Sequence, residues 1–111
     1  MRRLELVTKE IAKRLPALYA NEALSAEEVK VPLKIFDPCG RHAWYATEYD
    51  PEGKLAFGYV VGGFGPDCDE LGYFSITEIE NVKGPLGIGM ERDLCWDPET
   101  TLADVIEGKV R

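Results

Sequence analysis

AWYATEYDPEGKLAFGYVV, residues 43–61, is the stretch that decides the fold of this chain. Two runs rich in aromatic and β-branched residues flank Asp50-Pro51-Glu52-Gly53, which places proline second and glycine fourth in a four-residue turn. Such runs on either side of a turn sequence are typical of a β-hairpin. We therefore predict two adjacent antiparallel strands, at residues 43–49 and 54–61.

Further strands are predicted on both sides of this hairpin. Val29–Phe36 alternates apolar with polar residues, which predicts a strand with one buried face. Pro32 cannot donate to a sheet ladder, so this strand should lie at an edge or contain a bulge. Cys68–Phe74 is predicted as another strand, and Leu94–Trp96 is a candidate for a short one.

A helix is predicted near the N-terminus, because apolar residues recur there at three- and four-residue steps. The residues on this stripe are Leu4, Val7, Ile11, Leu15 and Leu18. The helix begins at a cap formed by Thr8 or already at Arg3, and Pro16 either ends it or opens a further turn.

Two short helices are predicted in the C-terminal part. Ser75, followed three residues later by Glu78, has the capping-box pattern and predicts a helix through about Val82. Thr101 begins a last helix over Leu102–Glu107, with Asp104 in the capping position, and Gly108 stops it.

The order of these elements indicates the fold class. Consecutive strands with helices at the ends are typical of α+β proteins, and strands joined by short turns pair antiparallel. The chain has 111 residues, of which 45% are hydrophobic and 30% charged, as is usual for one globular domain. We predict a single α+β domain over residues 1–111, with an antiparallel sheet of about four strands, an N-terminal helix and short C-terminal helices.

The charge balance bears on the partners. The net charge of −7 predicts an acidic surface, which repels phosphate backbones, so nucleic acid is an unlikely partner. A nucleic-acid-binding module stays open as an alternative through the basic residues of the N-terminal helix: Arg2, Arg3, Lys9, Lys13 and Arg14.

The expected location is the cytoplasm. Glycines interrupt the longest apolar stretch, Leu55–Phe64, which is shorter than the roughly 20 residues that span a membrane. Charged residues follow the basic start where a signal peptide has an apolar block. We expect no contact with a membrane.

The three cysteines predict no disulfide framework, because they are odd in number and widely spaced. We expect buried or half-buried free thiols and no cofactor. A zinc site would combine Cys39 or His42 with Cys68 and Cys95, but the close ligand pair of zinc sites is missing.

Two glycine-rich segments, Gly62–Gly65 and Gly84–Gly89, invite comparison with phosphate-binding loops. Phosphate motifs need a helix that opens directly after the loop, and nucleotide hydrolases add a lysine beside serine or threonine. Neither segment has these features, so we interpret both as wide turns.

The carboxylates provide the one candidate for catalysis. Glu48 and Asp50 point to the same side of a predicted strand, Glu70 lies on another strand, and Glu91 lies beside a turn. Converging at one end of the sheet, they would bind a divalent ion in a metal-dependent hydrolase or nuclease. With 20 acidic residues, some clustering is also expected by chance.

Aromatic residues suggest an interaction surface. Strand alternation places Trp44 opposite Tyr45, and Tyr45 on one side with Thr47 and Tyr49. One sheet face is expected to be core and the other to bind a partner protein. The candidate interaction residues are Trp44, Tyr45, Tyr49, Tyr73, Glu91, Arg92 and Asp93.

Five motifs in order resemble one family. They are LPALY at 15–19, WYATEYD at 44–50, FGYVVG at 57–62, ELGYFS at 70–75 and MERD at 90–93. Over about Thr8 to Trp96 the chain is similar to the family called domain of unknown function 2958. The resemblance implies a bacterial protein carried on mobile genetic elements such as conjugative plasmids and phages, and it implies no reaction.

The expected function is that of a small acidic accessory protein of a mobile element. It would act by binding a host or element-encoded protein, in counter-defence or conjugation. The alternatives are the metal-dependent enzyme and the nucleic-acid-binding module described above.

Overall fold

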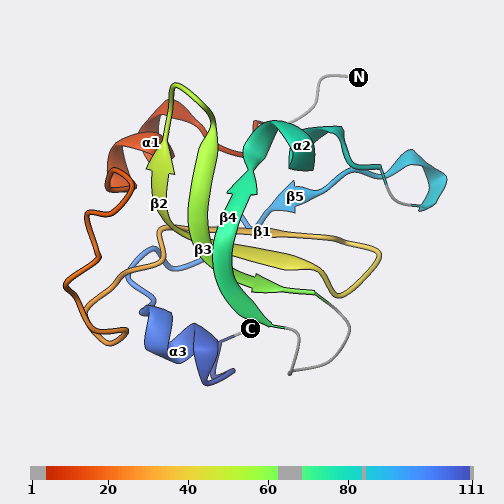
Figure 1. The fold of residues 1–111 in the computed structure, drawn as a ribbon. Helices are drawn as coiled ribbons and strands as arrows, with labels where there is room; N and C mark the ends of the chain where they lie inside the picture. The colour runs from red at the N-terminus through yellow and green to blue at the C-terminus, as the bar shows by residue number, and fades with distance from the viewer. Residues whose placement is uncertain (1–4, 63–68, 84, 111) are drawn as a thin grey trace.

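The computed structural model describes residues 5–62, 69–83 and 85–110 (Figure 1). Within these ranges an antiparallel sheet has five strands in the order β4-β3-β2-β1-β5. The strands are β1 (Leu33–Phe36), β2 (Ala43–Asp50), β3 (Leu55–Val61), β4 (Glu70–Ser75) and β5 (Glu91–Arg92). The helices are α1 (Lys9–Arg14), α2 (Ile76–Asn81), the 3-10 turn η2 (Pro85–Gly87) and α3 (Leu102–Ile106). The predicted α+β class is confirmed.

The predicted hairpin is strands β2 and β3. Tyr45 pairs with Tyr59, and the last pair before the turn is Asp50 with Leu55. Proline and glycine occupy the turn as predicted, but the left-handed backbone angle falls on Lys54, whose φ is 51°. The hairpin is extended on the far side by β4, which pairs along β3 from Val60 to Leu55.

A β-bulge in β2 changes which residues share a face. The register shifts between Ala46 and Glu48, so Thr47 is an extra residue on β2. Its side chain is buried, and its hydroxyl donates to the carbonyl oxygen of Phe57 at 3.1 Å. The prediction that Tyr45 and Tyr49 share a side is therefore wrong, because the extra residue shifts the alternation of side chains by one position between them.

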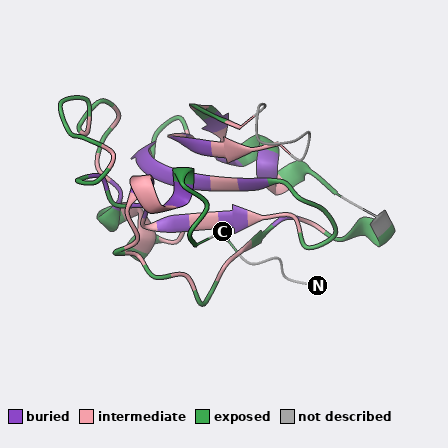
Figure 2. Ribbon diagram, turned by 90° about the horizontal axis from the view of Figure 1, so that it is seen from below, coloured by how far each residue is buried: buried purple, intermediate pink, exposed green. Residues whose placement is uncertain are grey.

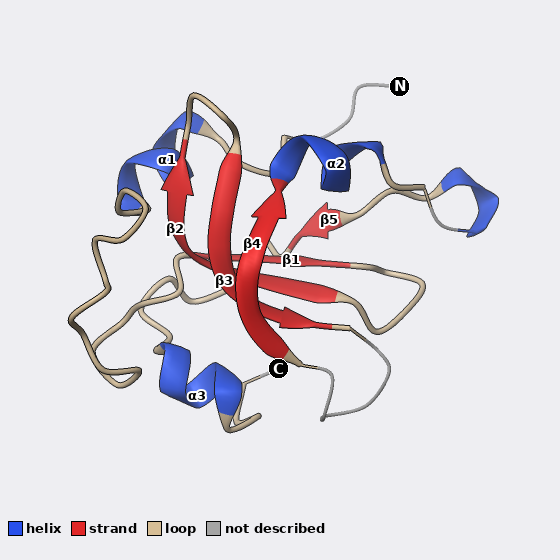
Figure 3. Ribbon diagram, in the orientation of Figure 1, coloured by secondary structure: helices blue, strands red, loops and turns tan. Residues whose placement is uncertain are grey.

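Each face of the sheet has its own apolar cluster. The first cluster joins α1 and α2 to the sheet, and its buried members include Leu15, Leu33, Ile35, Ala46, Tyr49, Phe74 and Ile76. The second lies under α3, and its buried members are Val29, Val31, Ala43, Tyr45, Tyr59, Leu102 and Val105. Figure 3 shows α1 and α2 near one end of the sheet and α3 near the other. Figure 2 shows buried and half-buried segments alternating along the central strands, and most of the exposed residues in loops and at the edges.

The segment predicted as one strand over 29–36 is divided at Pro32. Val31 donates its N–H to Thr100 at 2.8 Å and packs in the second cluster, whereas Leu33 begins β1 and packs in the first. The predicted alternation of buried with less buried residues is confirmed over residues 29–36, but the side chains buried before Pro32 pack in the second cluster and those buried after it pack in the first. Strand β1 also lies between β2 and β5 and is not an edge strand.

The helix starts follow the predicted caps. Thr8 accepts from the N–H of Ile11 at 3.2 Å, which selects the later of the two predicted starts, and α1 ends before Leu15. Ser75 accepts from Glu78 at 3.2 Å, as the capping box predicts. At α3, Thr101 is the cap, and it accepts from the N–H of Asp104.

The predicted short strand at Leu94–Trp96 is not a strand. The fifth strand is Glu91–Arg92, which pairs with Phe36 and Ile35 of β1. After it the chain turns, because the Asp93 carboxylate accepts from the N–H of Cys95 at 2.9 Å. Strand β4 begins at Glu70, so the predicted strand start at Cys68 and most of the loop at 62–67 lie outside the described residues.

Candidate functional site

The residues that follow the bulge in β2 are paired with the connector between α1 and β1. Strand β1 pairs with β2 only up to Ala46. Beyond it, Tyr49 donates its N–H to the carbonyl oxygen of Pro16 at 2.9 Å. The Asn21 side chain donates to the carbonyl oxygen of Thr47 at 3.2 Å. The connector thus forms hydrogen bonds with the part of β2 that β1 does not reach.

The Glu48 side chain anchors this connector by hydrogen bonds. Its side chain is 5% exposed, and its two oxygens accept from the backbone N–H groups of Tyr19 and Asn21, each at 2.8 Å. Hydrogen bonds to a charged group contribute about 1.5–3 kcal/mol each. Tyr19 has a left-handed φ of 72°, which is uncommon for a residue other than glycine. The carboxylate therefore holds a strained turn in place.

An apolar groove of about 340 Å³ lies between this connector, the β2–β4 face and α3. Glu48, Phe57 and Tyr73 form one row across three strands, and the Phe57 and Tyr73 rings meet edge to face at 5.0 Å. The groove is lined by Tyr19, Asn21, Glu22, Leu24, Ala26, Val29, Glu48, Phe57, Leu71, Tyr73, Leu102 and Ile106.

Exposed apolar side chains gather at this groove. Among the described residues, ten large apolar side chains are exposed, and five of them line the groove: Tyr19, Leu24, Leu71, Tyr73 and Ile106. Tyr19 is 65% and Tyr73 50% exposed, so the two rings stand at its rim. Contiguous exposed apolar surface with a polar rim is typical of an interaction site.

The groove is acidic. Glu22 and Glu48 are the charged residues that line it, and no lysine, arginine or histidine of the described chain does so. The pKa of Tyr73 is raised, first by its hydrogen bond with Tyr19 and further by burial and the nearby carboxylates. This geometry suits an apolar ligand with a positive charge at its edge.

The predicted carboxylate cluster does not assemble. Glu48 is engaged by the connector, Asp50 accepts from Glu52 in the hairpin turn, and Glu70 and Glu91 are exposed on strands at opposite edges of the sheet. Across residues 5–62, 69–83 and 85–110, no three His, Cys, Asp or Glu residues are grouped to hold a metal ion.

The predicted aromatic surface is likewise dispersed. Tyr45 and Tyr49 are 2% and 5% exposed and belong to the two opposite clusters. Trp44 is half-buried and stacks on His42 at 5.6 Å. Of these four predicted contact residues, Tyr73 alone is exposed. The other three pack against the two apolar clusters, because the sheet buries side chains on both of its faces.

The expectation of buried thiols is wrong for Cys39 and Cys95, which are both exposed. Each donates its backbone N–H at 2.9 Å to an aspartate two residues earlier, Asp37 and Asp93, in a tight turn that turns the side chain outward. Cys68, a member of the zinc site that the cysteine spacing disfavours, lies outside the described residues.

Three of the five basic candidates belong to the described part of the chain. Lys9, Lys13 and Arg14 are exposed on α1, whereas Arg2 and Arg3 lie outside the described residues. Of the predicted interaction segment at 91–93, Glu91 is exposed, and Arg92 and Asp93 are half-buried beside a second, smaller cleft.

Sequence reasoning missed the connector side of the groove. The polar stretch at residues 21–28 has no helix or strand pattern, yet Leu24 within it and Tyr19 just before it line the groove. The available signal was large apolar side chains in a segment without periodicity. Their meeting with α3 depends on the bulge, which no local pattern predicts.

Comparison with known proteins gives one match. The profile of the family described as "Protein of unknown function (DUF2958)" matches residues 6–109. No curated protein and no solved structure matches the chain. In the described part of the chain, no helix is both long enough and apolar enough to cross a bilayer.

Proposed function

The chain belongs to the DUF2958 family of proteins of unknown function. We propose that it is an interaction module whose apolar groove binds an apolar segment of a partner protein that is flanked by lysine or arginine. The observation that carries this proposal is the gathering of five exposed large apolar side chains at one groove. Burying such side chains against a partner contributes roughly 25 cal/mol for each Å² of apolar area.

The charge of the groove selects the partner. Glu22 and Glu48 line it, and no described lysine, arginine or histidine does. The whole chain carries a net charge of −7. A partner segment with lysine or arginine beside its apolar residues would be attracted, and an acidic segment would be repelled. The aromatic rim, Tyr19 and Tyr73, offers large contact surfaces that lose little conformational freedom on binding.

The groove is also held ready before a partner arrives. The Glu48 carboxylate ties Tyr19 and Asn21 to β2, and the bulge residue Thr47 ties the same connector through its carbonyl group. A preformed site avoids the entropy cost of ordering a loop on binding. Both Glu48 oxygens are occupied in this task, which favours a structural role over that of a catalytic base.

The proposal includes the setting. We expect a cytoplasmic accessory protein of a mobile genetic element, whose partner is a host or element-encoded protein in counter-defence or conjugation. The family resemblance of the motifs motivates this part of the proposal. The negative net charge of the chain agrees with a partner surface that carries lysine or arginine.

A pair of synthetic peptides tests the groove directly. Both carry the same leucine and phenylalanine core, flanked by lysines in one peptide and by glutamates in the other. We expect only the lysine-flanked peptide to shift the amide resonances of Tyr19, Leu71 and Tyr73 in a nitrogen-15 spectrum. Equal shifts by both peptides, or shifts confined to other residues, would contradict the proposal.

Matched variants connect the groove to a partner from cells. Leu71→Ser removes an exposed apolar side chain from the groove, and Leu86→Ser removes one that is 97% exposed outside it. We expect a protein captured by the native chain to be lost with Leu71→Ser and kept with Leu86→Ser, and its binding segment to contain apolar and basic residues. A partner lost equally with both variants would show that the groove is not its site.

A further inference from the structure

A second cleft of about 120 Å³ lies on another part of the molecule, between α1, the start of β1 and the segment after β5. Its charged residues are Arg14, Lys34, Arg92 and Asp93, three of them basic and one acidic. The remaining lining residues are Ile11, Pro32, Leu33, Leu94, Trp96 and Pro98. This basic cleft stands out in a chain with 20 acidic and 13 basic residues.

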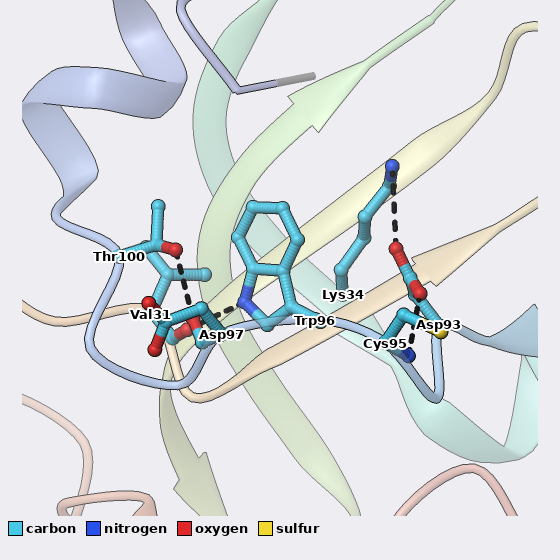
Figure 4. A network of polar contacts seen from close by, with 7 residues as sticks. All are labelled: Val31, Lys34, Asp93, Cys95, Trp96, Asp97 and Thr100. Carbon is cyan, nitrogen blue, oxygen red and sulfur yellow. Dashed lines mark hydrogen bonds and ion pairs between the residues drawn. The ribbon is translucent and has the colours of Figure 1, made fainter.

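Lys34 is held by an ion pair with Asp93 and by three aromatic rings. Its Nζ lies 5.6–5.8 Å from the ring centres of Phe36, Tyr45 and Trp96. Asp93 is 3.8 Å from it, which is longer than a hydrogen bond (Figure 4). Cation–π attraction adds to this ion pair, and Nζ forms no hydrogen bond with a described residue.

Hydrogen bonds and ion pairs hold some of the other residues of the cleft. Trp96 donates its indole N–H to the carbonyl oxygen of Val31 at 2.8 Å, as Figure 4 shows. Arg92 donates from Nη1 to the carbonyl oxygen of Glu5 and keeps its other donors. Arg14 forms no ion pair with a described residue. Asp93 is engaged by Cys95 and Lys34.

We propose that this basic cleft binds an oxyanion, a carboxylate or phosphate group, carried on a small apolar stem. Guanidinium and ammonium groups donate charge-assisted hydrogen bonds to such oxygens, and arginine does so with two parallel bonds. Arg14 and Arg92 are the basic residues of the cleft without a carboxylate partner among the described residues, and the apolar lining beside them accommodates the carbon atoms that carry the group. This site is separate from the groove and does not depend on the function proposed for it.

Four small probes test the cleft: phenyl phosphate, benzoate, inorganic phosphate and uncharged benzyl alcohol. The readout is the indole N–H resonance of Trp96, assigned with Trp96→Phe, together with the amides of residues 92–96. We expect phenyl phosphate or benzoate to shift these resonances saturably, with affinity that falls as salt is added. The stronger of the two identifies the oxyanion.

A matched pair on α1 separates a site from general attraction. Lys13 and Arg14 are both exposed in the last turn of α1, but only Arg14 lines the cleft. We expect Arg14→Gln to weaken binding about tenfold, the effect of roughly one lost charge-assisted hydrogen bond, and Lys13→Gln to leave it nearly unchanged. Arg92→Gln is a second test from the other side of the cleft.

Three results would overturn the proposal. They are no saturable shift with any anion, equal shifts with benzyl alcohol, and equal weakening by Lys13→Gln and Arg14→Gln. Inorganic phosphate that binds as tightly as phenyl phosphate would overturn the role of the apolar stem. Circular dichroism of each variant verifies that a loss of binding is not a loss of fold.

Discussion

The apolar groove and the basic cleft are built on the same sheet in opposite ways. The groove depends on a buried carboxylate that accepts from backbone N–H groups, and its lining charges are negative. The cleft depends on a lysine surrounded by three rings, and positive charges dominate its lining. The net charge of −7 describes neither site. Partners are selected by local charge, and here the local charges differ in sign.

The strongest way to break both sites at once is to alter the sheet under them. A Cβ at Gly58 would lie 1.9 Å from the carbonyl oxygen of Tyr45, so backbone would have to move beside the bulge. We expect Gly58→Ala to lower the free energy of unfolding by more than about 3 kcal/mol or to prevent folding. Urea unfolding followed by circular dichroism measures this.

The matched control for this variant lies opposite it in the sheet. Gly72 pairs with Gly58, and a Cβ there would meet nothing within 4 Å. We expect Gly72→Ala to change the free energy of unfolding by less than about 1 kcal/mol. Equal destabilisation by both variants would show that the cause is the loss of glycine itself and not the close approach at the bulge.

Removing Glu48 should separate the two sites. Glu48→Ala leaves two backbone N–H groups, those of Tyr19 and Asn21, without their acceptor. We expect a loss of about 2–4 kcal/mol and faster hydrogen exchange at both amides, with the basic cleft unchanged. Glu70→Ala, at an exposed carboxylate, is the control and should change stability by less than about 0.5 kcal/mol. Unchanged exchange at Tyr19 would contradict the role given to Glu48.

The fate of Glu48 shows what sequence can and cannot predict. Period-two alternation, turn residues and cap residues predict the hairpin, the caps at Ser75 and Thr101, and the α+β class, because each signal lies within a few neighbouring residues. The bulge at Thr47 depends on pairing across β2 and β3, so alternation placed Tyr45 and Tyr49 on one side when they occupy two. Glu48, a candidate member of a metal-binding carboxylate cluster in the sequence, accepts from two backbone N–H groups instead.

Trp96→Phe tests the cleft without touching the groove. The substitution removes the indole N–H that donates to Val31 and reduces one of the three rings around Lys34. We expect a loss of about 1–2 kcal/mol in unfolding free energy, because a carbonyl group loses its donor. Trp44→Phe is the control, since its indole stacks on His42 and its N–H forms no hydrogen bond with a described residue. Equal losses in the two variants would indicate that ring size alone matters.

The smallest expected effect is the titration of Tyr73 at the groove rim. Its pKa is raised above the ordinary value of 10.0, mainly by the hydrogen bond with Tyr19. A raised pKa means that the folded state favours the neutral phenol, so this contribution to stability is complete below pH 10.0 and is lost as the pH rises through the folded pKa. Tyr19→Phe removes the partner hydroxyl and should lower the pKa of Tyr73 toward its ordinary value.

Tyrosinate absorbance measures this shift, with Tyr73→Phe to identify which titration belongs to Tyr73. The oxyanion response of the basic cleft should be the same in the native chain and in Tyr19→Phe, because the two rim tyrosines do not line that cleft. A pKa that stays raised in Tyr19→Phe would transfer the cause to burial and the carboxylates of Glu48 and Glu22, the remaining contributions at this position. In that case burial and the negative charge of the groove, and not the contact between its two rim hydroxyls, raise the pKa of Tyr73. A cationic peptide in the groove would then lower that pKa, which joins this titration to the charge preference proposed for the partner.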